Sequence, residues 1–161
     1  PMLTIGETAP DFELPNQAGE RVRLSDFRGK KVVLFAFPHA NTMGCNNQAC
    51  GFRDEFEEFR THNAVVLGIS CDPQAVLQEW KTNKNLPYDL LSDTTHEVVQ
   101  AWGAWGIPMF GIIKVPMINR SYWVIDEQGV LIDQQINVLP GTSVKKALEA
   151  VERVITPTTT G

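Results

Sequence analysis

The 161-residue chain lacks several features that mark particular classes of protein. It has no run of Lys or Arg, and its formal net charge of −5 argues against nucleic acid or an anionic membrane as a partner. No apolar run approaches the roughly 20 residues of a membrane span. We also find no charged-then-apolar leader, no internal repeat and no linker. These absences predict a globular protein without a membrane partner.

Cysteine is scarce as well, with three residues at positions 45, 50 and 71. An odd number argues against a secreted framework of disulfides, so a reducing cytoplasm is the expected compartment. No pair has the C-x-x-C spacing of thioredoxin-type disulfide oxidoreductases. A C-x4-C pair without a second Cys/His pair is poor spacing for zinc. We therefore expect neither a metal nor an organic cofactor.

The chain does contain clear strand patterns. Two apolar runs rich in β-branched and aromatic residues predict buried strands at 32–37 and 64–69. Short alternating runs at 12–14 and 21–24 predict an N-terminal β-hairpin. The turn residues 126–129 predict a second hairpin near the end of the chain.

Helical patterns alternate with these strands. Apolar residues between 49 and 59 recur at helical spacing, and we expect three further helices: from Asp72 and Pro73, from Thr94 or Thr95 to Trp102, and from Thr142 or Ser143 to Ile155. Strand–helix alternation indicates a largely parallel central sheet. The sequence therefore predicts an α/β, thioredoxin-like fold in which helices flank a central mixed sheet. Residues 1–155 are expected to form one domain, and residues 156–161 a mobile tail.

One stretch combines a strand, a loop and a helix start around a cysteine. Pro38 ends the first buried strand, because proline lacks the N–H that a central ladder needs. Thr42 is a candidate N-cap, so Cys45 falls in the first turn of the following helix. Free amides and the helix dipole at that position favour an anion. We therefore expect Cys45 to be a nucleophilic thiolate.

The residues of this stretch resemble a known family. The spacing Pro38-x-x-x-Thr42-x-x-Cys45 is similar to the active-site signature of peroxiredoxins, and the second cysteine at position 50 resembles the bacterioferritin-comigratory (Q-type) branch. The N-terminal segment Ala9-Pro-Asp-Phe and the segment that begins at Arg120 are also similar to the family pattern. Met43 stands where the family usually has proline.

This resemblance implies a thiol-dependent peroxidase with a thioredoxin-like fold. Cys45 is then the residue that attacks hydrogen peroxide or an organic hydroperoxide, and Cys50 resolves the resulting sulfenic acid as a disulfide. The resemblance also implies that Thr42 directs its hydroxyl at the peroxide, that Pro38 shapes and shields the loop, and that Arg120 faces the thiolate. A helix terminus supplies at most about 2 kcal/mol toward an anion, so a cation has a physical reason to be there.

The spacing of the two cysteines sets a mechanical condition. Residues five apart on an α-helix have Cα atoms roughly 8–9 Å apart, whereas a disulfide needs about 4.4–6.8 Å. Cys45 and Cys50 cannot bond until the first turns unwind. Gly44 and the two asparagines at 46 and 47 make that opening easier.

Several alternatives stay open from the sequence. The chain could instead be a redox sensor or binding protein that switches by a Cys45–Cys50 disulfide without turnover. As a peroxidase it would use a thioredoxin-like dithiol reductant and act as a monomer or weak homodimer. Cys71 follows a strand without an evident partner and is interpreted as structural, and His39 as an incidental loop residue.

Residues 104–118 form the least charged stretch, with Lys114 as the only charge. Two prolines and two glycines predict an irregular loop beside the active site, because the stretch directly precedes Arg120. The loop is either buried against the sheet or exposed as a contact surface. If exposed, it would serve self-association or favour bulky organic hydroperoxides.

Overall fold

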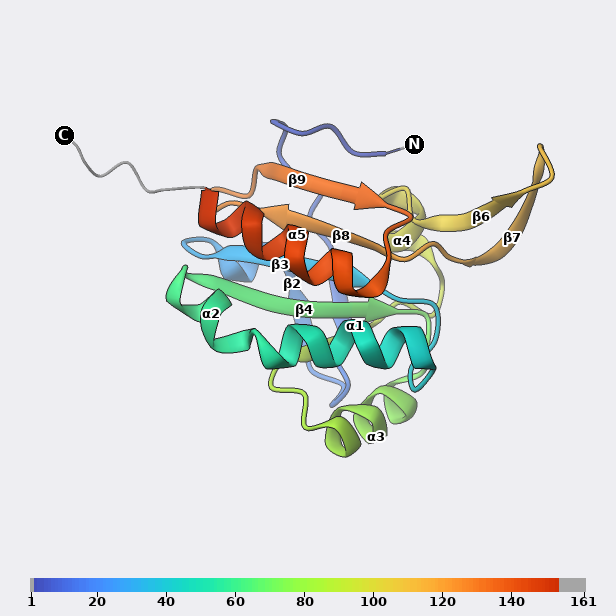
Figure 1. Ribbon diagram of the computed structural model, residues 1–161, viewed down its shortest axis with the longest axis horizontal. Helices are drawn as coiled ribbons and strands as arrows, with labels where there is room; N and C mark the ends of the chain where they lie inside the picture. The colour runs from blue at the N-terminus through green and yellow to red at the C-terminus, as the bar shows by residue number, and fades with distance from the viewer. Residues whose placement is uncertain (1, 154–161) are drawn as a thin grey trace.

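A five-stranded mixed sheet organises the computed structural model, which describes residues 2–153 (Figure 1). The strand order is β5-β4-β3-β8-β9, with β3, β4 and β5 parallel and β8 and β9 antiparallel. The five strands are β3 (Lys31–Ala36), β4 (Ala64–Ser70), β5 (Asp89–Ser92), β8 (Ser121–Ile125) and β9 (Leu131–Ile136). This arrangement confirms the predicted central mixed sheet.

Helices cover the sheet on both faces. The helices are α1 (Met43–Asp54), α2 (Phe56–Thr61), α3 (Gln74–Lys84), α4 (Glu97–Ala101) and α5 (Pro140–Arg153). Side chains from α1, α2, α3 and α5 share one core cluster with β3 residues such as Phe35. The opposite cluster joins α4 and the N-terminal hairpin to β3 residues such as Leu34. Strand β3 is buried along its whole length because both clusters pack on it.

The N-terminal hairpin forms where the alternating runs predict it. Its strands are β1 (Glu13–Pro15) and β2 (Arg21–Arg23), paired antiparallel, and the short 3-10 helix η1 (Leu24–Phe27) follows them. The predicted hairpin at the end of the sheet is also confirmed, with β8 and β9 joined through Asp126–Gly129. The single helix predicted across 49–59 is wrong in one respect: it divides into α1 and α2 at Glu55.

Several predicted helix caps are wrong. Helix α3 begins at Gln74 with Pro73 as its N-cap residue, while the carboxylate of Asp72 bonds to Ala40 N–H and Ser70 Oγ–H. Helix α4 begins after His96, not at Thr94 or Thr95. Its first amides are instead satisfied by the buried carboxylate of Asp93, which accepts from the N–H groups of Val98 and Val99. Helix α5 begins at Pro140, ahead of the predicted Thr142 or Ser143.

Residues 104–118 are not the irregular loop that the prolines and glycines suggested. Strands β6 (Trp105–Met109) and β7 (Ile113–Ile118) pair antiparallel as a hairpin that projects from the body (Figure 1). We call residues 105–118 the arm. Gly106 at a register shift and Gly111 in the turn both have positive φ. A two-stranded ribbon has only edge strands, which tolerate proline.

Two predictions fall partly or wholly on residues that are not described. Helix α5 is described to Arg153, so its predicted end at Ile155 and the tail 156–161 lie outside the described residues. The single-domain organisation of residues 1–155 stays a prediction. Within residues 2–153 no helix has the length and apolar character needed to cross a membrane.

Candidate active site

The predicted nucleophile, Cys45, lies at the start of the helix that follows the central strand β3. Strand β3 ends at Ala36, and the chain then runs through an exposed loop to Thr42, the N-cap residue of α1. Cys45 is the third residue of this helix and is fully buried in the core cluster. Its position in the first turn, where backbone N–H groups lack helical partners, is the one the sequence predicted.

Thr42 occupies the N-cap position without capping the helix through its side chain. Its hydroxyl donates a hydrogen bond of 2.9 Å to the carbonyl oxygen of His39, and no side-chain cap bond forms. The prediction of a hydroxyl cap is therefore wrong, because the hydroxyl folds back onto its own loop. This bond closes a tight turn between Pro38 and the helix and so fixes the loop that precedes Cys45.

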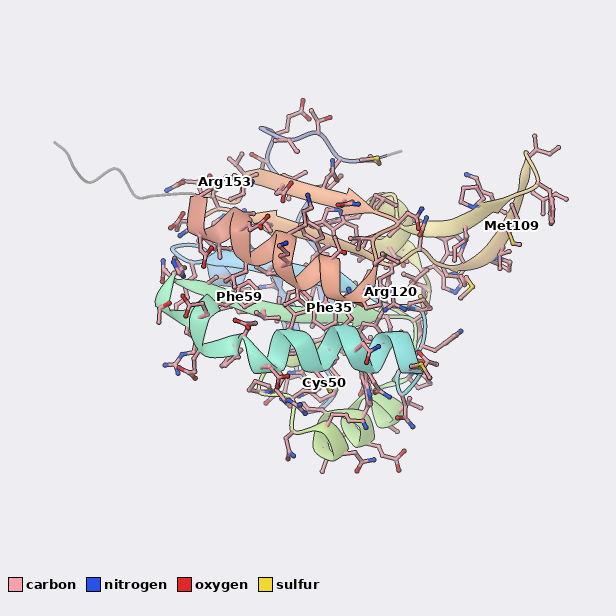
Figure 2. All side chains as sticks on the ribbon, viewed as in Figure 1. Phe35, Cys50, Phe59, Met109, Arg120 and Arg153 are labelled. Atoms are coloured by element: carbon pink, nitrogen blue, oxygen red, sulfur yellow. The ribbon has the colours of Figure 1, made fainter. Side chains whose placement is uncertain are left out.

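Arg120 reaches the buried sulfur from a strand 75 residues away in the sequence. Strand β8 runs antiparallel to β3 with Ser121 opposite Ala36, so the residue before β8 emerges beside the point where β3 ends. Figure 2 shows Arg120 at this end of the sheet, next to the base of the arm. Its Nη1 lies 3.4 Å from Cys45 Sγ. A half-buried guanidinium thus faces the thiol.

Gln48 is a site residue that the sequence analysis missed. Arg120 Nη1 donates a 2.7 Å hydrogen bond to Gln48 Oε1, and Gln48 Nε2 donates a 3.1 Å bond to Ser143 Oγ on α5. Gln48 is fully buried, so these bonds hold the guanidinium against the sulfur. Its spacing of three from Cys45 on one helix was the available signal.

Gly44 makes room for the guanidinium. A Cβ at this position would lie 2.9 Å from Arg120 Nη2 and 3.7 Å from Pro140 Cγ. The absence of a side chain lets Arg120 and the start of α5 approach the first turn of α1 closely. The contact also places Met43 and Leu139, the neighbours of Gly44 and Pro140, beside the site.

Cys50 lies on the same helix as Cys45 but does not join this cluster. It is half-buried, and all three cysteines are free thiols. Helix α1 is continuous from Met43 to Asp54, so the two sulfurs are separated by more than a disulfide allows. Cys50 lies near Tyr88. Burial raises the pKa of Tyr88 well above its ordinary value, and the charge of Cys50 adds to the effect.

The loop before Cys45 is tied to the neighbouring strand. The Asp72 carboxylate accepts a 2.9 Å hydrogen bond from the backbone N–H of Ala40. The exposed ring of His39 lies 3.7 Å from the same carboxylate, which places the imidazole on the loop's outer side. Pro38 is half-buried between the end of β3 and this loop. The shaping role of Pro38 and the incidental role of His39 stay predictions.

Cys71 occupies a contrasting environment directly after β4. Burial raises the pKa of Cys71 from 9.0 to about 12, and the charges of Asp93 and Asp72 add to the effect. A thiol of this kind stays protonated and unreactive at neutral pH. This supports its interpretation as structural.

One group of side chains in the described part of the chain has the composition of a metal site. The ligand atoms of Glu58 on α2, His62 just after α2 and Glu152 on α5 lie within 4.8 Å of one another. These ends of the helices lie opposite the start of α1, far from Cys45 (Figure 1). We assign no metal to them, because the carboxylates are exposed and such groups commonly lie together without an ion.

Comparisons with known proteins bear directly on the site around Cys45. The AhpC/TSA family model matches residues 5–134. The chain belongs to the AhpC/TSA family. Within it, the chain is similar to a putative peroxiredoxin of Mycobacterium tuberculosis, at 41% identity over 84% of this chain and 87% of that protein. Peroxiredoxin Bcp of Bacillus subtilis is 37% identical over 93% of this chain and 96% of its own length. The chain is thus a peroxiredoxin of the bacterioferritin-comigratory type.

Solved structures agree with this assignment. Peroxidoxin BcpB of Mycobacterium tuberculosis superposes with a TM-score of 0.85 at 33% identity, over 96% of this chain and 99% of that one. Xanthomonas campestris peroxiredoxin Q shares the fold at 22% identity, with a TM-score of 0.83, over 89% and 90% of the two chains. The peroxiredoxin is a thiol-dependent peroxidase, an antioxidant oxidoreductase, and the alternative of a sensor without turnover is not favoured.

Proposed function

We propose that Cys45 is the peroxide-reducing thiol of this peroxidase and that Cys50 is its resolving thiol. The observation that carries the proposal is the 3.4 Å contact between Arg120 Nη1 and Cys45 Sγ in the first turn of α1. The helix dipole and the guanidinium act on the same sulfur, whereas neither Cys50 nor Cys71 lies close to both a helix N-terminus and a guanidinium. Arg120 is therefore assigned the role of stabilising the thiolate.

The first chemical step follows from these groups. The thiolate of Cys45 attacks one oxygen of the peroxide, the O–O bond breaks, and the leaving oxygen takes a proton to become water or an alcohol. Cys45 is left as the sulfenic acid. First-turn amides and Arg120 are placed to stabilise charge that develops on the oxygens. Because Cys45 is fully buried, a peroxide reaches it only when neighbouring side chains give way. We assign Thr42 to orienting the peroxide and Pro38 to shaping the loop.

The second step requires α1 to open. The Cys50 sulfur attacks the sulfenic sulfur, water leaves, and a Cys45–Cys50 disulfide forms. The intact helix keeps the two Cα atoms roughly 8–9 Å apart, so its first turns must unwind in each cycle. Two bonds resist this motion: Trp80 Nε1 donates a 2.6 Å bond to Asn46 Oδ1, and Asn46 N–H bonds to the Thr42 carbonyl at 2.7 Å.

Substrate, reductant and compartment complete the proposal. We assign hydrogen peroxide and organic hydroperoxides as substrates; a related Xanthomonas campestris protein is described by its alkyl peroxide reduction activity. A thioredoxin-like dithiol protein would reduce the disulfide in a reducing compartment, the cytoplasm. The three free cysteines support this compartment. We propose a monomer or weak homodimer, and neither nucleic acid nor a membrane is assigned as a partner.

Stopped-flow oxidation by hydrogen peroxide tests the cysteine roles. Cys45→Ser should lose peroxide consumption altogether, while Cys50→Ser should consume one equivalent and stop at the sulfenic acid. Cys71→Ser is the matched control and should turn over like the wild type. Turnover by Cys45→Ser would refute the assignment of the nucleophile.

Hydrogen exchange tests the resolving step separately. In the fully oxidised enzyme, amides between residues 43 and 52 should exchange faster than in the reduced enzyme, because the first turns have unwound. Amides of α5 serve as the internal reference. Unchanged exchange in α1 after complete oxidation would show that Cys50 is not the resolving residue.

A further inference from the structure

Most of the exposed large apolar side chains among the described residues lie on the arm or next to the start of α1. Nine large apolar residues are exposed in the described part of the chain, and six of them lie on the arm or beside Cys45. Those six are Met43, Met109, Phe110, Ile112, Ile113 and Leu139. We call this set the apolar rim. At the arm's tip, Phe110 is 88% exposed and Ile112 is 97% exposed. Apolar surface gathered in this way marks a contact surface.

The arm and the site belong to the same end of the molecule. Figure 1 shows the arm projecting from the end of the sheet where α1 and α5 begin. Strand β7 ends at Ile118, two residues before Arg120, and Figure 2 shows Met109 out on the arm with Arg120 at its base. The base is held by the Trp105 ring, which stacks on His96 with ring centroids 4.0 Å apart. Beyond this base, residues 108–114 are all exposed.

We propose that the apolar rim is the surface on which the protein dithiol reductant docks. This rests on the proposed function, in which a Cys45–Cys50 disulfide must be reduced once in every turnover. One thiolate of the reductant attacks a sulfur of that disulfide, the S–S bond breaks, and a mixed disulfide forms. The second thiol of the reductant then displaces the enzyme's sulfur. The reductant loses two electrons, and Cys45 and Cys50 recover two thiols.

The size of the rim favours this partner over a second copy of the chain. A stable interface buries roughly 800 Å² on each partner through about 20–30 residues. Six side chains, four of them on a narrow arm, fall well short of that area. Transient redox encounters occupy the low end of the range, below about 1,200 Å² in total. A reductant that must leave after each turnover needs a small surface of this kind.

The distribution of charge also favours a protein reductant over an anionic lipid surface. The arm holds one charged residue, Lys114, so its tip can be desolvated without breaking ion pairs. The chain as a whole carries −5, which disfavours an anionic lipid surface. The start of α1, where the disulfide forms after unwinding, carries the exposed Met43 next to Gly44 and Cys45. Met43 of the rim therefore borders the bond that the reductant must reach, while the arm projects from the same end of the molecule.

Comparing two reductants tests the proposal. The variant Ile112→Ser with Ile113→Ser should lose about tenfold in kcat/KM for a bacterial thioredoxin, because the docking contacts are removed. Turnover supported by dithiothreitol needs no docking and should stay within about twofold of the wild type. Ile5→Ser is the matched control, because Ile5 is 54% exposed and Ile113 is 58% exposed. Ile5 lies away from the arm: the next residue, Gly6, bonds to Leu131, at the end of β9 that is farther from Arg120. It should change neither rate.

Each contrary result has a distinct meaning. Unchanged thioredoxin kinetics, or an equal loss with both reductants, would overturn the docking surface. A drop in apparent mass by size exclusion would reassign the rim to a second copy. Loss of sedimentation with phosphatidylcholine vesicles would reassign it to lipid. Oxidation of Cys45 by one equivalent of peroxide, measured without any reductant, reports on the proposed function alone, so the two proposals fail separately.

Discussion

Cys45 and Cys71 lie past the ends of two adjacent parallel strands, β3 and β4, yet their surroundings are opposite. Cys45 sits in the first turn of a helix with the guanidinium of Arg120 3.4 Å away. Burial, together with the nearby carboxylates of Asp93 and Asp72, raises the pKa of Cys71 to about 12. The two thiols, both beyond the ends of neighbouring strands, thus have nearest charges of opposite sign.

The difference teaches that strand-end placement does not by itself make a cysteine reactive. Both thiols lose hydration on burial, which favours the neutral form. What separates them is the sign of the nearest charge and the presence of free helix amides. Replacing a thiol, the cation or a carboxylate should therefore change the contrast between the two sites.

The largest effect is expected from exchanging the nucleophile. Cys45→Ser should abolish peroxidase turnover, since a serine hydroxyl is not ionised at neutral pH and does not form the sulfenic acid. Cys71→Ser should retain nearly full activity and a normal circular dichroism spectrum. Steady-state peroxide consumption with dithiothreitol measures both. Loss of activity in Cys71→Ser with its fold intact would erase the contrast between the two sites.

Removing the cation should make the Cys45 thiol behave more like the Cys71 thiol. Arg120→Met keeps much of the side-chain volume and should slow peroxide reduction by about 10²–10³-fold, the usual effect of losing one transition-state donor. The thiolate fraction at pH 7 should fall, as followed by ultraviolet absorbance. Arg120→Lys, which keeps the charge without the fork, is the matched control and should recover part of the rate. An unaltered thiolate fraction in Arg120→Met would remove Arg120 from the site.

A smaller effect is expected from the residue that positions the cation. Gln48→Met removes the acceptor for Arg120 and leaves Ser143 without its donor, so the rate should fall by about tenfold. The pH profile should shift toward higher pH because the guanidinium is no longer held at the sulfur. Gln48→Glu keeps an acceptor for Arg120 but adds a negative charge beside the sulfur, so it should shift the profile further toward higher pH. A loss of stability with an unshifted pH profile would make Gln48 merely structural.

The smallest effect is expected from removing one of the carboxylates near Cys71. Asp93→Asn removes one of the two charges near Cys71 and should lower the pKa of Cys71 modestly, because burial is the larger cause. The folded pKa lies above the unfolded one, so the stabilising effect of the protonated thiol is full below pH 9.0 and is lost as pH approaches about 12. The rate of alkylation against pH measures the pKa. An unchanged pKa of Cys71 in Asp93→Asn would show that the Asp93 charge contributes nothing to the contrast.

Local pattern alone was enough for a large part of the molecule. The apolar runs at 32–37 and 64–69 predicted β3 and β4, and the turn at 126–129 predicted the hairpin of β8 and β9. The same reasoning put Cys45 in the first turn of its helix and made a direct bond to Cys50 impossible while that helix is intact. These features depend on residues within a few positions of one another, so periodicity and end signals carry them.

Other features depended on distant segments. The arm reads as a loop in sequence because proline and glycine break strand patterns, yet a two-stranded ribbon outside the main sheet accommodates them. The start of α4 was misplaced because its amides are capped by Asp93, a buried side chain that precedes the predicted threonines. Thr42 was expected to cap α1, but its hydroxyl had a nearer acceptor in the His39 carbonyl.

The sequence by itself determined where the proposed nucleophile Cys45 stands on its helix and which family the chain resembles, because both depend on one short segment. Only the tertiary structure decided what surrounds that thiol. Strand order places β8 beside β3 and so brings Arg120 across 75 residues to Cys45, with Gln48 and Ser143 holding it there. The same sheet places Cys71 near Asp93. Electrostatic interaction depends on distance through space, and that distance is set by how the strands pair, not by separation along the chain.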